Sequence, residues 1–111
     1  MTPQETEEFA RLAWPHLTTL AGFGAGASIP YKAFQELVGL DHWRGPNGPE
    51  HVLSFILERC QENNMPPLSI VVVNGKTGRP GPGYWYARTG PRFQQDKKAV
   101  ANFDWPKKPP F

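Results

Sequence analysis

The sequence contains a single cysteine, Cys60, among its 111 residues. One cysteine excludes an intramolecular disulfide and any zinc site built from several cysteines. No apolar run approaches the ~18–20 residues that a membrane span needs. The N-terminus shows neither a basic segment nor a long apolar one, so no secretory signal is indicated. These absences predict a cytoplasmic protein without membrane contact.

Metal-ligating and charged residues are also sparse. The three histidines, His16, His42 and His51, do not share the spacing of three to five residues typical of a metal site. We therefore expect no metal and no cofactor. Net charge is only +2, yet it is unevenly spread. Residues 1–60 carry four Lys/Arg against seven Asp/Glu, a net charge of −3, whereas residues 61–111 carry eight against three, a net charge of +5. The basic half points mildly to an anionic partner.

The length and composition fit one folded domain. Hydrophobic residues make up 39% of the chain and aromatic residues 13%, which suffices for a core. Proline (13) and glycine (11) are abundant and indicate many turns. We expect one domain over residues 1–90 and an irregular C-terminal tail over residues 91–111 that packs on it through aromatic side chains.

The pattern of apolar residues predicts three helices followed by a β-hairpin. The first helix opens at Thr2 with a capping box and is expected to kink or restart at Pro15. The second begins near Ser28 and ends at Gly39. The third begins at Pro49 and buries one apolar face that includes Cys60. An apolar, β-branched strand over residues 68–73, a tight turn at Asn74-Gly75 and a second strand over residues 84–87 then form the hairpin. The fold class is therefore α+β, with a winged helix-turn-helix arrangement.

Several short motifs resemble the DNA-binding domain of the O6-alkylguanine-DNA alkyltransferases and their alkyltransferase-like relatives. The stretch Ile29 to Phe34, followed by Val38-Gly39, resembles the family's I-S-Y-x-x-L-A helix. Leu68 to Asn74, followed by Gly78 and Gly83-Tyr84, resembles its P-C-H-R-V-V strand and wing. The resemblance implies a winged-helix fold, with residues 52–57 in the recognition helix and Tyr31 in the place of a tyrosine that helps rotate a nucleotide.

Two departures from the family pattern bear on the chemistry. The acceptor Cys-His-Arg is absent, and Ser69 stands near its place without a neighbouring histidine to activate it. The arginine that fills the gap left by a flipped base is also absent, since Glu50 and His51 occupy that region. Alkyl transfer is therefore not expected, and base flipping is in doubt.

The function that these observations favour is non-enzymatic DNA binding. The third helix would approach a groove of the duplex while basic residues of the wing contact phosphates. The residues expected to contact nucleic acid are Tyr31, Lys32, His51, Lys76, Arg79 and Arg88.

Two alternatives remain open at this stage. The aromatic residues Trp43, Trp85, Trp105 and Phe111 exceed what a core of this size should need, so we expect them to be exposed, and tryptophan is favoured at protein interfaces. A small protein-binding inhibitor or immunity-type protein is thus the main rival. The third hypothesis is a metal-free nuclease that uses His42 or His51 in acid–base catalysis.

Overall fold

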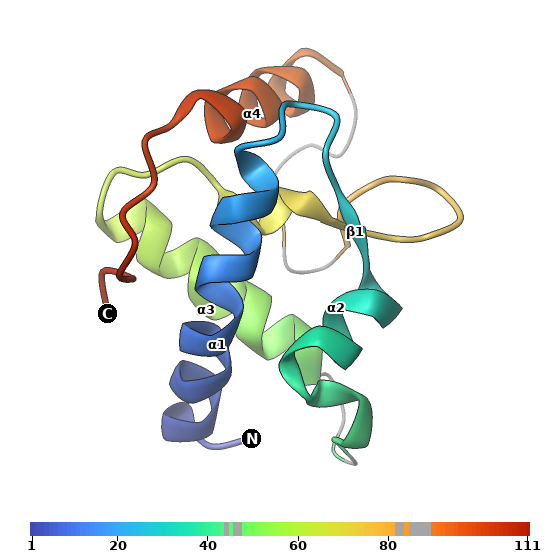
Figure 1. Cartoon of the computed structure of the whole chain (residues 1–111), viewed down its shortest axis with the longest axis vertical. Helices are drawn as coiled ribbons and strands as arrows, with labels where there is room; N and C mark the ends of the chain where they lie inside the picture. The colour runs from blue at the N-terminus through green and yellow to red at the C-terminus, as the bar shows by residue number, and fades with distance from the viewer. Residues whose placement is uncertain (44, 46–47, 82–83, 85–89) are drawn as a thin grey trace.

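In the part of the chain that the structure describes, the fold consists of four helices and a very small two-stranded sheet. The computed structural model describes residues 1–43, 45, 48–81, 84 and 90–111. In chain order (Figure 1) the elements are α1 (Pro3–Ala21), β1 (Ile29–Pro30), α2 (Tyr31–Val38), the 3-10 turn η1 (Leu40–His42), α3 (Gly48–Glu62), the 3-10 turn η2 (Leu68–Val71), β2 (Val72–Val73) and α4 (Gly90–Asn102). The α+β class is confirmed, whereas the winged helix-turn-helix arrangement is not.

Helix α1 begins with the predicted capping box. The Glu5 N–H donates to Thr2 Oγ1 (3.1 Å), and the Thr2 N–H donates back to Glu5 Oε1 (2.9 Å). This return hydrogen bond lowers the pKa of Glu5. The helix runs through Pro15 as one element, so of the predicted kink or restart the restart is wrong. Pro15 lies on the exposed face of the helix. Proline has no backbone N–H, so the carbonyl four residues earlier lacks its helical hydrogen bond, and on this face water can bond it instead.

Helix α3 follows the sequence prediction closely, whereas α2 begins at Tyr31 and not near Ser28, because Ile29–Pro30 are extended and pair with Val72–Val73. Helix α2 ends at Gly39, which adopts the left-handed conformation (φ 80°) typical of a C-terminal cap. The predicted apolar face of α3 is buried and contacts α1 and η2; it comprises Val52, Leu53, Ile56, Leu57 and Cys60. The chain leaves α3 at Asn63 and Asn64, and Asn64 has a positive φ of 56°.

The predicted strand over residues 68–73 is mostly wrong. Residues 68–71 form the 3-10 turn η2, and only Val72–Val73 are extended. This strand pairs in parallel with β1, in the register Ile29 to Val72 and Pro30 to Val73, so the sheet is not a hairpin. All six residues of the run are buried. Its apolar character thus reflects complete burial, which does not distinguish a strand from a turn.

The turn after β2 also differs from the prediction. A two-residue turn at Asn74-Gly75 needs positive φ at both positions, but in this loop only Gly78 has one (φ 69°). The chain instead forms a longer loop over residues 74–79, closed by a single antiparallel bridge between Val73 and Pro80. Of the predicted second strand, Tyr84 is buried, and residues 85–87 lie outside the described part of the chain.

The C-terminal segment is more ordered than predicted. Residues 90–102 form α4, which buries Phe93 and Val100 on one face. The tail beyond α4 then runs back along α1 and α3 (Figure 1). Its aromatic rings pack against the buried Trp14: the ring centroids of Trp105 and Phe111 lie 5.7 Å and 5.8 Å from that of Trp14. The Trp14 Nε1–H donates to the carbonyl oxygen of Pro106 (2.9 Å), which fixes the tail to the body.

The core lies between α1, α3 and η2, which pack against one another. Trp14, Leu17, Phe34, Leu53 and Ile56 are among its fully buried side chains. Within the part of the chain that the structure describes, no helix is long and apolar enough to cross a membrane.

Candidate nucleic-acid interface

An open groove lies between the start of α2 and the loop over residues 74–79. We call it the α2–loop groove; its volume is about 540 Å³, and it is lined by Pro30, Tyr31, Lys32, Glu50, Asn74, Gly75, Lys76 and Gly81. The parallel pairing of β1 and β2 creates it, because both strands end at the same edge. Beyond that edge β1 continues directly into α2, and β2 continues into the loop. A Cβ on Gly75 would lie 3.6 Å from Pro30 Cβ, which shows how closely the two segments approach.

The loop over residues 74–79 is held by its own hydrogen bonds. The Asn74 side-chain oxygen accepts from the Lys76 N–H (2.8 Å) and from the Thr77 N–H (3.3 Å). The Gly78 N–H donates to the Asn74 carbonyl (2.8 Å), and the Asn74 N–H donates to the Arg79 carbonyl (2.8 Å). An asparagine that bonds the following backbone in this way stabilises a turn. The exposed side chains of Lys76 and Arg79 therefore extend from a backbone that is held in place by hydrogen bonds within the loop.

Tyr31 forms the wall of the groove nearest to Gly81. The Tyr31 ring lies against the Gly81 backbone, since a Cβ there would fall 2.5 Å from Tyr31 Cε2 and 2.6 Å from Cζ. Only glycine fits at this position without moving the ring. Tyr31 is partly buried and packs against the hydrophobic core.

The charges around the groove are predominantly positive. Lys32 and Lys76 line it, opposed by one carboxylate from Glu50. Among the described residues, no ion pair engages Lys32, Lys76 or Arg79. The first turn of α2 carries no acidic residue, and its N-cap, Pro30, makes no side-chain capping bond. The amide groups at the start of α2 add a partial positive charge. The groove is therefore suited to an anion.

The structure brings together three of the six predicted contact residues. Tyr31, Lys32 and Lys76 line the groove. Arg79 lies exposed on the adjoining loop, and His51 is exposed in the first turns of α3 without lining the groove. Arg88 lies outside the described residues.

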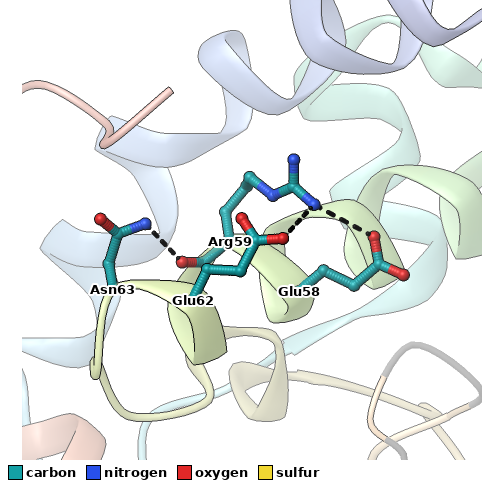
Figure 2. Close-up of polar contacts among 4 residues, drawn as sticks. All are labelled: Glu58, Arg59, Glu62 and Asn63. Carbon is teal, nitrogen blue, oxygen red and sulfur yellow. Dashed lines mark hydrogen bonds and ion pairs between the residues drawn. The ribbon is translucent and has the colours of Figure 1, made fainter.

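The outward face of α3 is a poor candidate for contact with nucleic acid. Figure 2 shows Arg59 held between Glu58 (3.5 Å) and Glu62 (2.8 Å), while Asn63 donates to the Arg59 carbonyl (2.8 Å). The charge of Arg59 is neutralised by these ion pairs, and the side chains of Glu58 and Glu62 are both more than a third exposed. Phosphates would be repelled there. The role predicted for the third helix thus receives no support from its charges.

Of the three tryptophans predicted to be exposed, the two that the structure describes are partly buried. Trp43 and Trp105 are partly buried and pack against the core. A Cβ on Gly45 or on Gly48 would lie 2.7 Å from the Trp43 indole, so both glycines make room for that ring. Trp105 donates its Nε1–H to the Val100 carbonyl (2.9 Å). Both side chains thus contribute to the packing of the fold, and Trp85 lies outside the described residues.

The residues considered for catalysis do not form a constellation. His42 is 91% exposed, and its one ion-pair partner in the described chain is the adjacent Asp41 (3.4 Å). Cys60 is fully buried, and desolvation raises the pKa of its thiol to about 11. Ser69 is buried in η2. Within the described part of the chain, no group of three or more His, Cys, Asp or Glu side chains is arranged to hold a metal ion.

Sequence reasoning missed part of the groove. Glu50, Asn74 and Gly81 line it, but no motif marks them as a group. They meet because two strands of two residues each pair in parallel, and a pair that short leaves no periodic signal. Comparisons of the chain with protein-family models, with curated proteins and with solved structures gave no match, so the resemblance to the alkyltransferases stays a prediction.

Proposed function

We propose that this protein binds nucleic acid through the α2–loop groove and performs no chemistry on it. The observation that carries the proposal is the convergence of Lys32 and Lys76, which are far apart in sequence, on one groove. Neither lysine has an ion-pair partner among the described residues. Lysines placed in this way can neutralise phosphates and release counterions.

The backbone around the groove suits phosphate contacts. The amides at the start of α2 are free of a side-chain cap, and a helix N-terminus favours negative charge. Arg79 extends the positive charge along the loop beyond Lys76. These groups would contact the sugar–phosphate backbone and position the chain on its ligand without reading bases.

The remaining wall of the groove is apolar and aromatic. Pro30 and Tyr31 line it beside the two lysines. A tyrosine ring beside cationic groups can pack against a sugar or a base while the lysines hold phosphates. This combination favours nucleic acid over a small inorganic anion. Duplex DNA is the first ligand to test, followed by single-stranded DNA and RNA.

A charge-matched pair of variants tests the proposal. The double variant Lys32→Ala/Lys76→Ala removes two positive charges from the groove, and Lys107→Ala/Lys108→Ala removes two exposed positive charges from the C-terminal tail. Affinity for a labelled duplex is measured by fluorescence anisotropy over a range of salt concentrations. The groove variant should lower the slope of log affinity against log salt by about 0.9 for each phosphate that the protein no longer neutralises.

The tail variant should keep nearly the affinity and slope of the unmodified protein. If both variants weaken binding equally, binding depends only on the net charge of the protein, and the α2–loop groove is not the binding site. If the unmodified protein binds none of the three nucleic acids, the proposal is wrong and the protein-binding alternative takes its place.

A further inference from the structure

A small, partly enclosed cavity lies between η2, α4 and the connection from α1 to β1. Its volume is about 80 Å³, and its lining includes Ala21 at the end of α1, residues 24–28, Val71 of η2 and Lys97 of α4. Figure 1 shows α4 beside the end of α1 and this connection. We call this space the α4 cavity. None of its described lining residues belongs to the α2–loop groove.

The walls of the α4 cavity that η2 and α4 contribute are apolar. Val71 belongs to η2, and Phe93 and Val100 form the buried face of α4. All three side chains are buried. A dry apolar cavity of about 150 Å³ holds one benzene ring, so a volume of about 80 Å³ holds roughly three or four non-hydrogen atoms. This is the size of a propyl group.

The connection from α1 to β1 contributes backbone to the α4 cavity. Gly24 and Gly26 line it, and no heavy atom lies within 4 Å of a Cβ built at either position. The Gly24 N–H donates to the Ala21 carbonyl (3.3 Å), and the Ala27 N–H donates to the Gly24 carbonyl (3.1 Å). In the described part of the chain, the N–H groups of Ala25 and Gly26 have no partner. They are free to donate to a bound group.

Lys97 is the one charged residue among the described residues that line the α4 cavity. Its ammonium lies 5.1 Å from the centroid of the Phe93 ring, and this cation–π contact holds the charge beside a wall of the cavity. The neighbouring Asp96 is engaged elsewhere, because its carboxylate accepts from the Tyr84 hydroxyl and from Arg92 Nε (2.9 Å). Among the described residues, Lys97 therefore has no carboxylate partner.

We propose that the α4 cavity binds a small aliphatic carboxylate of the size of butyrate, with its alkyl chain inside the cavity and its carboxylate beside Lys97. A propyl group matches the volume, and its burial against Val71, Phe93 and Val100 removes apolar surface from water. The carboxylate accepts hydrogen bonds from the Lys97 ammonium and from the backbone N–H groups of residues 25–26. Among the described lining residues, no acidic side chain repels it.

These groups disfavour other small ligands. Inorganic phosphate would place oxygen atoms against the apolar walls, where they would find no hydrogen-bond donors. A neutral molecule of the same shape would leave the charge of Lys97 unpaired. Sites for drug-sized ligands have volumes of about 300–1,000 Å³, so a nucleotide is too large for this cavity. The carboxylate site is therefore independent of nucleic-acid binding.

A series of carboxylates tests the proposal on the unmodified full chain. Amide chemical shifts are followed by nitrogen-15 NMR at constant ionic strength while acetate, propionate, butyrate or hexanoate is added. Butyrate should cause saturable shifts at residues 24–28 and 97–100, which border the cavity. Each methylene from acetate to butyrate should tighten binding about fourfold. Hexanoate should bind no more tightly than butyrate, because its chain exceeds the volume of the cavity.

The role of the charge is tested by a neutral ligand and by a pair of lysine variants. Butyramide has the same alkyl chain as butyrate and should bind about tenfold more weakly. Lys97→Gln should weaken the binding of butyrate by a similar factor. The matched control Lys98→Gln, at an exposed position that does not line the cavity, should change it by less than about twofold. Circular dichroism of both variants should match that of the unmodified protein.

Several results would overturn the proposal. Butyrate might as a first case cause no saturable shifts, or butyramide and butyrate might bind equally well, and either result would exclude a carboxylate site. Tighter binding of phosphate than of butyrate, or an affinity that keeps rising up to hexanoate, would show that the cavity does not enclose the alkyl chain. Equal weakening by Lys97→Gln and Lys98→Gln would mean that only net charge attracts the ligand. These titrations contain no nucleic acid, so their outcome is separate from that of the DNA-binding experiments.

Discussion

The ring of Tyr31 lies against the backbone of Gly81, with no room for a side chain between them. A Cβ on Gly81 would fall 2.5 Å from Tyr31 Cε2. This packing fixes the wall of the α2–loop groove, because Tyr31 and Gly81 both line it. The position of the ring therefore depends on a glycine fifty residues later in the sequence.

Gly81→Ala should move the Tyr31 ring. We expect a loss of about 1–3 kcal/mol in the free energy of unfolding from overpacking, together with weaker nucleic-acid binding. Urea denaturation and fluorescence anisotropy measure the two effects. Gly26→Ala is the matched control, because no heavy atom lies within 4 Å of a Cβ at Gly26. If the two variants have the same free energy of unfolding and the same affinity for nucleic acid, the packing of Tyr31 on Gly81 contributes to neither stability nor binding.

Cys60 should be unreactive in the folded protein. Its thiol is fully buried, and desolvation raises the pKa to about 11 from an ordinary value of 9.0. Labelling by a thiol reagent should be slow for the native protein and fast in denaturant. Rapid labelling of the native protein would contradict the burial of this face of α3.

The raised pKa of Cys60 also predicts a dependence of stability on pH. Between about pH 9 and pH 11 the unfolded thiol loses its proton while the folded one keeps it. The free energy of unfolding should therefore fall as the pH rises through this interval. Cys60→Ala should show a smaller fall over the same interval. An identical pH dependence for both proteins would contradict the shift.

Val71→Asp should destabilise the fold strongly. Val71 is 5% exposed within η2, so the substitution buries a charge without a partner. We expect a loss of about 3–5 kcal/mol in the free energy of unfolding. The control Gln95→Asp, on the exposed side of α4, should change it by less than about 0.5 kcal/mol. A thermal midpoint for Val71→Asp within a few degrees of the unmodified protein would place η2 outside the core.

The elements that the sequence predicted well carry local signals. The capping box at Thr2, the cap at Gly39 and the apolar face of α3 each depend on residues within a few positions of one another. Helix α4 was missed because its buried face consists of Phe93 and Val100, seven residues apart, amid polar side chains. Two buried apolar residues in a segment of 13 do not produce a recognisable period.

The errors around the groove have one physical origin. The run over residues 68–73 is β-branched and apolar, which favours a strand, but tertiary packing buries it as a 3-10 turn with only two extended residues. Pairing between Val72 and Ile29 then decides which loops meet. Lys32 and Lys76 were both predicted as contact residues, yet their convergence on one groove depends on this long-range pairing.

The location of the nucleic-acid interface is tested most directly by amide chemical shifts during titration with a short DNA duplex. Nitrogen-15 spectra of the full chain report every backbone N–H separately. We predict that the largest shifts occur at residues 31–33 and 74–79, which border the α2–loop groove. Largest shifts at Glu58, Gln61 and Glu62 on the outward face of α3, with residues 31–33 and 74–79 unchanged, would contradict binding at this groove.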